Sequence, residues 1–319
     1  MRGDQDMSQD NAEFTFVIIT DTHVDVRPQA TDGKWWNRTL HTLSLEVLSA
    51  AVQEIEARAP DFVVHCGDVT DKSDEASFRK SAQVLEALPM PLHFLPGNHD
   101  TYESGSRQLA ARLFHVEQAR FHRTEHVGRW RLIFIDAAYW QNKDGSVGEA
   151  FSAENYFDMT TPELVLTWLR TEFARDNETP TLCFMHPMVV VRPGYPVSRL
   201  PGGGLPPPHP VDLSEDIFPS REIRPILAGA ACVKAVFSGH GHFHDCVVED
   251  DILYCSTGAM EEYPCEMRLV KIFPNRLETE VFGLADNDCA QQSYIQEWGN
   301  DWVAGREQDR SMTHSFQPE

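Results

Sequence analysis

A layered α/β protein is the fold class that the sequence predicts, and two observations support it. Short apolar segments of strand length recur along the chain, and helical patterns of apolar residues lie between several of them. Because the segments are apolar on both faces, they are typical of strands inside a largely parallel sheet that is covered on both sides. The segments are residues 14–20, 61–65, 91–95, 131–135, 181–185 and 233–237.

Helices are predicted between these strands where apolar residues recur at intervals of three and four. A further helix is expected with Thr161 as its N-cap and Pro162 in its first helical position. Alternation of strands and helices places ligands beyond the carboxyl ends of the strands. The two clearest apolar stripes consist of Leu40, Leu43, Val47, Ala51 and Ile55, and of Phe78, Ala82 and Leu85.

The pattern changes after Tyr254, where strands follow one another without helices. These strands, at 251–257, 267–273 and 277–283, are expected to extend a second sheet. Residues 192–219 are rich in Pro and Gly, which predicts a long excursion from the core that is too short to be a domain.

The two ends of the chain differ from its body. Residues 1–13 are polar and predict a flexible N-terminus, whereas 14–285 are expected to form one domain. Residues 286–319 are expected to form a C-terminal helix and tail, which packs on the domain or forms a partner surface; a homodimer is one expectation from this stretch. Its apolar residues at roughly helical spacing are Tyr294, Ile295, Trp298 and Trp302.

The charge of the chain excludes some classes of partner. With 49 acidic residues and 27 lysines and arginines, the formal net charge is -22, which argues against a nucleic-acid polymer or an anionic membrane surface and favours a small-molecule substrate. No run of about 18 apolar residues predicts a bilayer span. The acidic N-terminus lacks the features of a signal peptide, so a cytoplasmic location is expected. Seven scattered cysteines favour reduced thiols.

Residue types that bind metals follow five of the predicted strands. Glycines at 67, 97, 239 and 241 allow a sharp exit from the strand beside them. An Asp-x-His or His-x-His pair on an extended segment would place both side chains on one side. Mixed carboxylate, imidazole and amide donors suit Mn, Fe, Zn or Co. The residues concerned are Asp21, His23, Asp68, Asn98, His99, Asp100, His186, His240 and His242.

The order of these motifs carries a resemblance to a known family. The runs DTH (21–23), GDVTD (67–71), GNHD (97–100), MHP (185–187) and GHGH (239–242) resemble those of the calcineurin-like metallophosphoesterase superfamily. HCGDVTDKSDEASF and LPMPLHFLPGNHD are similar, more narrowly, to class III cyclic-nucleotide and glycerophosphodiester phosphodiesterases. The resemblance implies a four-layer α/β/β/α sandwich of two mixed sheets, the metallo-dependent phosphatase fold, with the catalytic domain at 14–285.

The resemblance also implies two divalent or trivalent metal ions, drawn from Mn, Fe, Zn or Co, with Mn and Fe favoured. Asp68 would bridge the two ions through its two oxygens, about 3.5–4 Å apart in such sites. A hydroxide shared by the ions would attack phosphorus in line. The implied ligands are Asp21, His23, Asp68 and His242 for one ion, and Asp68, Asn98, His186 and His240 for the other.

His99 is expected to act on the substrate rather than on a metal. It would contact the substrate's phosphate or leaving-group oxygen and serve there as general acid or as a cationic stabiliser. Asp71 is the expected orienting partner of His99, with Asp100 as the competing candidate. His244 makes GHFH an alternative to GHGH, and it is kept as a residue outside the ligand set.

Several other residues are interpreted as structural. His65 and His93 lie within predicted strands and are expected to pack, and His41 is expected on the surface or in packing. Trp35 and Trp36 follow the first motif and are equally expected to line the substrate pocket or to form a core or subunit contact. The 192–219 excursion is expected to overhang the site.

Three functions remain open from the sequence. The first is hydrolysis of a small phosphodiester such as a cyclic nucleotide or glycerophosphodiester. The second is a phosphomonoesterase or nucleotide pyrophosphatase on the same metal core, because loops around the pocket decide which ester is cleaved. The third is a metal-free scaffold of this fold, which the presence of every implied ligand disfavours.

Overall fold

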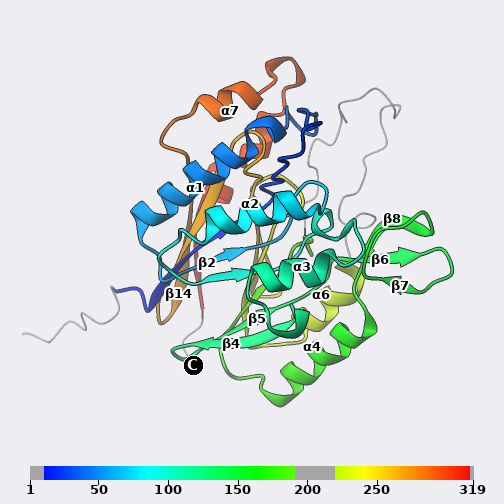
Figure 1. Ribbon diagram of the computed structural model, residues 1–319. Coiled ribbons are helices and arrows are strands. Elements are labelled where there is room, and N and C mark those ends of the chain that lie inside the picture. Colours follow the sequence, from blue (N-terminus) through cyan, green and yellow to red (C-terminus); the bar gives the residue numbers. More distant parts are fainter. Residues whose placement is uncertain (1–10, 191–219, 317–319) are drawn as a thin grey trace, which may run out of the picture.

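Two six-stranded sheets pack face to face, with helices on the outer face of each (Figure 1). The computed structural model describes residues 11–190 and 220–316, so most of the expected flexible N-terminus and the 192–219 excursion lie outside the described residues. The first sheet has the order β15 (Ser311–Ser315), β14 (Arg276–Gly283), β13 (Glu266–Ile272), β1 (Phe14–Ile19), β2 (Phe62–His65) and β3 (Leu92–Phe94).

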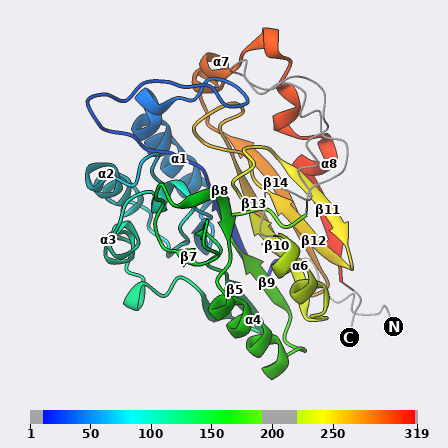
Figure 2. The same cartoon turned by 90° about the vertical axis from the view of Figure 1, so that its right-hand side faces the viewer.

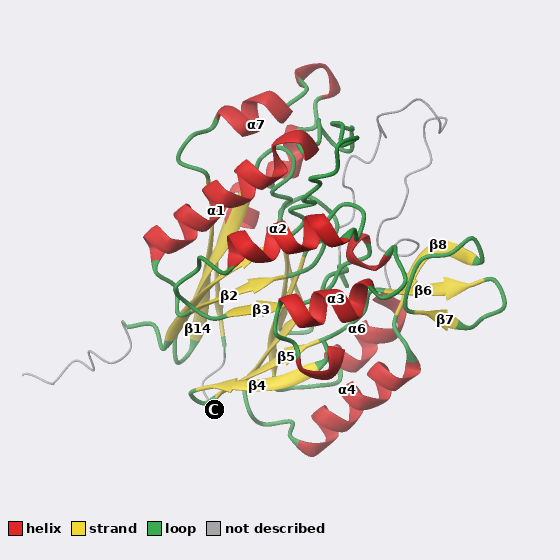
Figure 3. Cartoon of the chain, viewed as in Figure 1, coloured by secondary structure: helices red, strands yellow, loops and turns green. Residues whose placement is uncertain are grey.

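The second sheet lies behind the first and is also mixed. Strands β5, β9, β10 and β12 are parallel, whereas β11 and β4 pair antiparallel at its two edges. Its order is β11 (Asp245–Glu249), β12 (Ile252–Ser256), β10 (Val233–Ser238), β9 (Thr181–Phe184), β5 (Trp130–Phe134) and β4 (Arg123–Val127). A small third sheet, which projects at one side in Figure 3, consists of β7 (Val147–Gly148), β6 (Tyr139–Asn142) and β8 (Asn155–Thr160).

The helices form the outer two layers, as the two views in Figures 1 and 2 show. The layer against the first sheet consists of α1 (Ser44–Arg58), α2 (Glu75–Leu85) and α3 (Ser106–Leu113), and the layer against the second of α4 (Glu163–Arg175) and α6 (Ser220–Ala228). The predicted four-layer α/β/β/α sandwich is therefore confirmed. Among the described residues, every helix is too short or too polar to cross a bilayer.

Burial on both faces explains why the central strands are apolar throughout. In β9, Leu182 and Phe184 face the core between the sheets, while Cys183 belongs to the cluster under α4 and α6. Between the sheets, Phe16 stacks on Phe62 with ring centroids 5.1 Å apart. It also meets Phe184 and Phe237 of the second sheet edge-on. This aromatic core fixes the two sheets against each other.

All six predicted strands are confirmed to within one or two residues. The sheet is indeed covered on both sides, but the largely parallel sheet implied by the alternation is divided into two mixed sheets, each with helices on one face and the other sheet on the second. The last strands also divide differently: 251–257 joins the second sheet, but 267–273 and 277–283 extend the first, where β13 pairs with β1.

The predicted start of the fourth helix is wrong by one residue. Pro162 occupies the N-cap position with extended backbone angles, and its carbonyl accepts hydrogen bonds from Val165 and Leu166 at 2.9 and 3.1 Å. The Thr161 hydroxyl makes no hydrogen bond within the described residues, so it does not cap the helix.

The expected C-terminal helix through Tyr294, Ile295, Trp298 and Trp302 is also wrong. Helix α7 (Asp288–Ser293) ends before Tyr294, and two 3-10 turns, η5 (Gln296–Trp298) and η6 (Asp301–Ala304), follow it with Gly299 at a φ of 60° between them. Trp302 packs against Trp36 at a centroid distance of 5.0 Å. The short α8 (Glu307–Arg310) then leads into β15, which joins the first sheet.

Candidate metal centre

The predicted site residues lie in loops at the carboxyl ends of strands from both sheets. Asp21 and His23 follow β1, Asp68 and Asp71 follow β2, Asn98 and His99 follow β3, His186 follows β9, and His240 and His242 follow β10. Parallel strands bring these loops to one edge of each sheet, and the face-to-face packing joins the two edges. Residues more than 200 positions apart in the sequence are thereby in contact.

The local backbone at these positions differs from the expected strand alternation. β1 ends at Ile19 and β10 at Ser238, so the ligand pairs lie beyond the strands in a turn conformation. Asp21, His23 and Asp68 have positive φ values of 51°, 39° and 54°, and His240 and His242 share this conformation. Such angles cost about 1–3 kcal/mol for residues other than glycine and cluster at functional sites. The backbone N–H groups of Thr22 and His23 both donate to the Asp68 carbonyl, which helps to hold the turn.

Asp21, His23 and His242 form the first of two ligand groups. Asp21 Oδ1 lies 3.3 Å from His242 Nε2 and 3.7 Å from His23 Nε2. All three side chains are buried, yet Asp21 Oδ1 and His23 Nε2 make no hydrogen bond within the described residues. Buried polar atoms in proteins are nearly always satisfied, so this arrangement fits a bound cation.

Asp68, His186 and His240 form the second group, and Asn98 adjoins it. His186 Nδ1 donates to the Cys66 carbonyl at 2.8 Å, which leaves Nε2 as the nitrogen that could coordinate an ion. His186 Nε2 lies 3.2 Å from Asp68 Oδ2 and 3.0 Å from Asn98 Oδ1. The group therefore converges on one point with a carboxylate, an amide and imidazoles.

Asp68 lies between the two groups. Its Oδ2 atom is 3.6 Å from His23 Nε2 of the first group and 3.2 Å from His186 Nε2 of the second. Its Oδ1 atom instead accepts a hydrogen bond of 2.7 Å from the backbone N–H of His99. One oxygen, rather than the expected two, thus faces both groups. A side chain at Gly97 would collide with this carboxylate, which explains the glycine.

His99 pairs with Asp71 beside the two groups. His99 Nδ1 lies 2.9 Å from the Asp71 carbonyl and 3.2 Å from Asp71 Oδ1. Asp100 is buried and accepts hydrogen bonds from three backbone N–H groups, including that of Thr70, so it joins the loops and does not contact the His99 ring. Asp71 also lies 3.7 Å from His23 Nδ1, which makes His23, Asp71 and His99 a third group with metal-ligand spacing.

The buried carboxylates and histidines of the centre shift one another's pKa values. Burial opposes ionisation of Asp68, but His186 and His99 outweigh it and hold the pKa of this carboxyl well below its usual range. Burial alone would lower the pKa of His242, but Asp21 and Glu262 outweigh it and raise that pKa to about 10. Burial and repulsion from His186 lower the pKa of His240 to about 3.

No Lys or Arg of the described residues pairs with Asp21 or Asp68. Within the described residues, Asp21 and Asp68 have only histidines as ion-pair partners. Buried carboxylates need positive partners, so the centre fits a metal ion, whose charge would replace that of protons on these histidines. Because such ions compete with protons for His242, metal affinity should fall as the pH is lowered.

Comparison with known proteins decides the family. The family model described as calcineurin-like phosphoesterase matches residues 14–244, most of the chain. The chain belongs to the calcineurin-like phosphoesterase family. The resemblance seen in the five motifs is therefore confirmed.

Curated relatives of the phosphoesterase are named as phosphodiesterases. A probable cyclic nucleotide phosphodiesterase of Synechococcus sp. is 24% identical over 240 residues, which cover 75% of this chain and 77% of the relative. A glycerophosphodiester phosphodiesterase of Enterobacter lignolyticus is 28% identical over 130 residues, which cover 40% of this chain and 41% of the relative.

Solved structures share the fold at low sequence identity. A dimetal phosphatase from Danio rerio has a TM-score of 0.66 and 16% identity, with 96% of this chain and 100% of that chain covered. A purple acid phosphatase from yellow lupin seeds has a TM-score of 0.54 and 13% identity, with 95% and 54% covered. These likenesses support the four-layer fold of the phosphoesterase.

Sequence analysis missed three residues beside the first ligand group. Glu261 and Glu262 are buried in the loop after β12, and His41 Nε2 lies 2.7 Å from Glu261 Oε2. His41, interpreted from the sequence as a surface or packing residue, thus contacts a buried glutamate beside the first ligand group. His65 is buried in β2 as expected, and His93 packs against Phe62. A Glu-Glu pair is usually a surface feature. The one feature of the sequence that could have indicated a role for this pair is its position after a parallel strand, which it shares with the predicted ligands.

Three further residues resolve alternatives from the sequence. His244 is buried 3.3 Å from Glu266 and belongs to neither ligand group, which favours GHGH over GHFH. Trp36 is buried and its Nε1 donates to the Gly241 carbonyl at 2.8 Å, so it is a core residue. Trp35 is 46% exposed with its ring 6.2 Å from that of His242, which fits a wall of the site.

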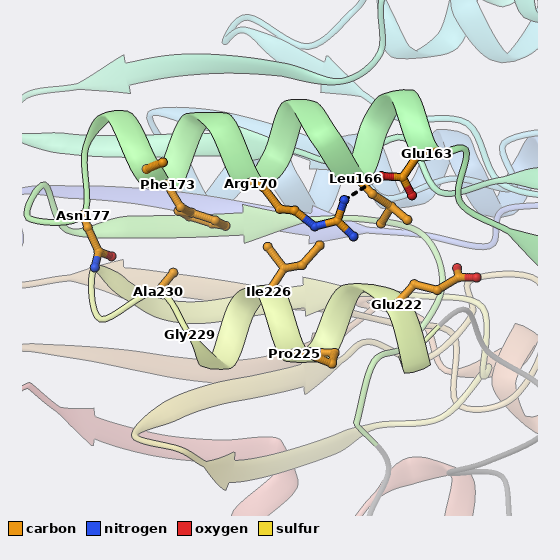
Figure 4. A pocket seen from close by; sticks show the side chains of 11 residues that line it. Glu163, Leu166, Arg170, Phe173, Asn177, Glu222, Pro225, Ile226, Gly229 and Ala230 are labelled. Atoms are coloured by element: carbon orange, nitrogen blue, oxygen red, sulfur yellow. Dashed lines mark hydrogen bonds and ion pairs between the residues drawn. The ribbon is translucent and has the colours of Figure 1, made fainter.

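A separate hollow of the phosphoesterase lies between α4 and α6 on the outer face of the second sheet (Figure 4). Arg170 and Glu163 form an ion pair of 2.6 Å at its rim, and Phe173 and Ile226 line its floor. None of the predicted site residues lines this hollow. The hollow is therefore separate from the candidate metal centre.

Proposed function

We propose that the phosphoesterase hydrolyses small phosphodiesters, of the cyclic-nucleotide or glycerophosphodiester type, with two metal ions. The observation that carries this proposal is the position of Asp68 Oδ2, 3.6 Å from His23 Nε2 and 3.2 Å from His186 Nε2. A carboxylate oxygen in this position would serve as a ligand to ions held by either group, and two such ions would supply the charge stabilisation of a two-metal hydrolase.

Each ion would have its own ligands in addition to Asp68. Two bound ions would supply positive charge to the phosphate oxygens and lower the pKa of a water molecule to about 7. Imidazole and carboxylate donors suit Mn, Fe, Zn or Co, of which Mn and Fe are favoured. The ligands are Asp21, His23 and His242 for the first ion, and Asn98, His186 and His240 for the second.

The residues of the chain orient these groups and supply a proton donor. The Cys66 carbonyl fixes the ring of His186, and the N–H of His99 fixes the Asp68 carboxylate. With Nδ1 engaged by Asp71, His99 has Nε2 available to donate to the leaving-group oxygen. The His99 side chain is 24% exposed, so it reaches the surface where a substrate would bind.

A diester is the favoured substrate for two reasons. Both curated relatives described above are named as phosphodiesterases. In addition, the two cationic side chains nearest Asp71 are already paired: Lys72 Nζ lies 3.1 Å from Asp71 Oδ2, and Arg27 forms two contacts of 2.8 and 2.6 Å with Asp25. Among the described residues near Asp71, a monoester dianion therefore finds little additional positive charge to bind.

Rates on a diester and a monoester test this proposal. With added Mn²⁺, kcat/KM for bis(p-nitrophenyl) phosphate is expected to exceed that for p-nitrophenyl phosphate by about tenfold or more, a difference of roughly 1.4 kcal/mol. Cyclic nucleotides and glycerophosphodiesters are then compared in the same assay. A preference for the monoester would favour a phosphomonoesterase. Equal inactivity of the protein and its Asn98→Ala variant on every ester would favour a scaffold.

A further inference from the structure

Glu261 and Glu262 lie side by side against the first ligand group. Both are buried, in the loop between β12 and β13. The loop is fixed to the centre through its backbone, because the N–H of Glu261 donates to the Asp21 carbonyl at 3.2 Å and the Glu261 carbonyl accepts from the Leu40 N–H at 2.7 Å. The two carboxylates are therefore held in place before any ion binds.

Glu262 orients His242. Its Oε1 atom lies 3.0 Å from His242 Nδ1, and its Oε2 atom accepts a hydrogen bond of 2.8 Å from the backbone N–H of Asn37. With Nδ1 held in this way, His242 presents Nε2 to Asp21 Oδ1 at 3.3 Å. A carboxylate behind a metal-binding histidine fixes its tautomer and makes the ring a stronger ligand.

Glu261 approaches the same group from another side. Its Oε1 atom lies 3.5 Å from His23 Nε2 and 3.6 Å from His242 Nδ1. Its Oε2 atom lies 2.7 Å from His41 Nε2, and His41 Nδ1 in turn lies 3.2 Å from the Thr31 carbonyl. Glu261 thus adds negative charge beside two histidines of the first group, and His41 holds its position.

The histidine His186 of the second group has a different hydrogen-bond partner from His242. The outer nitrogen of His186 meets the neutral carbonyl of Cys66 at 2.8 Å, whereas that of His242 meets the Glu262 carboxylate. A carboxylate partner attracts a cation more strongly than a carbonyl does, because it carries a full charge in a buried site. The two groups should therefore differ in their affinity for the same ion.

We propose that Glu261 and Glu262 are positioning residues that make the Asp21, His23 and His242 group the tighter of two ion sites. This inference rests on the two-metal centre of the proposed function. Glutamine is the informative replacement at 262, because it keeps the shape but has a single acceptor oxygen for the two donors, His242 Nδ1 and Asn37 N–H. Glu261 and Glu262 together would then set the order in which the two sites take up ions.

Metal titration of the metal-free protein tests the inference without an activity assay. Co²⁺ is added stepwise and followed by its visible absorption and by calorimetry, for the protein and for Glu261→Gln and Glu262→Gln. We expect two binding steps, of which the tighter weakens by about 10- to 100-fold in each variant while the weaker step is unchanged. Glu266→Gln, which removes a carboxylate beside His244 and Arg310, is the matched control and should titrate like the protein.

Two results would overturn the inference. One is unchanged affinity for both steps in Glu261→Gln and Glu262→Gln. The other is an equal loss of affinity in both Co²⁺ binding steps together with a lower melting temperature of the metal-free variant. That result would mean that the substitution destabilises the whole fold and not one ion site. Should one variant fail to fold, the other provides the same test. A protein that binds no pair of ions would instead contradict the proposed function, and the titration distinguishes the two failures.

Discussion

Replacing Asp68 with asparagine is expected to lower kcat/KM for phosphodiesters by at least about 10³-fold and to weaken both ion sites together. Loss of a residue that only supports a metal ligand typically costs about 10- to 100-fold in metal affinity. Asp68 Oδ2 faces both groups directly, so a larger loss is expected at both sites. Asparagine keeps the oxygen that accepts the His99 N–H but removes the charge between the ions. Metal content by mass spectrometry and steady-state rates measure the two effects.

The Asp68→Asn variant needs a control for the loss of one negative charge. Asp144→Asn serves, because Asp144 is exposed in the turn between β6 and β7, and it should retain both ions and full activity. Added Mn²⁺ should raise the melting temperature of the protein and of the control, but not that of Asp68→Asn, since a ligand that binds only the folded state stabilises it. Retention of two ions by Asp68→Asn would remove Asp68 from its bridging role.

Replacing His99 with asparagine is expected to lower kcat by about 10²- to 10⁴-fold while the metal content stays unchanged. The reason is that His99 contacts Asp71 through Nδ1 and would protonate the leaving group through Nε2. The loss should be smaller for p-nitrophenyl esters than for alkyl esters, because a good leaving group needs little protonation. Comparison of kcat on both kinds of diester measures this.

His115→Asn is the matched control for His99→Asn, since His115 is exposed and its φ of 56° suits asparagine. It should leave kcat unchanged. Loss of an ion from His99→Asn would contradict the assignment and would identify His99 as a ligand, in the group that it forms with His23 and Asp71. An equal loss on both kinds of ester would point to charge stabilisation without proton transfer.

The central strands were predictable because they are buried on both faces. Edge strands were not: β4 and β15 have polar, partly exposed residues, so no apolar run marks them. The sheet to which β13 belongs depends on its pairing with β1, more than 240 residues earlier in the chain, which local patterns do not contain. The spacing of aromatic residues around Trp298 predicted a helix, but these residues lie in two short 3-10 turns. Trp302 is fixed there by its contact with Trp36, which is distant in the sequence.

The candidate site was predictable where short motifs combine ligand residues with glycine. All the predicted ligands meet, although the alternation argument for Asp21 and His23 was wrong, because these residues adopt turn angles beyond the strand. Glu261 and His41 were missed since nothing local distinguishes a buried glutamate or histidine from an exposed one. Their positions become clear only when the loop after β12, which carries Glu261, and the segment before α1, which carries His41, are placed beside the first ligand group.

The measurement that tests the two-metal account most directly is anomalous diffraction from crystals soaked in Mn²⁺. The account predicts two peaks about 3.5–4 Å apart on either side of Asp68 Oδ2, one beside His23 and His242 and the other beside His186. A single peak, or peaks at surface carboxylates with Asp68 in contact with neither, would contradict it.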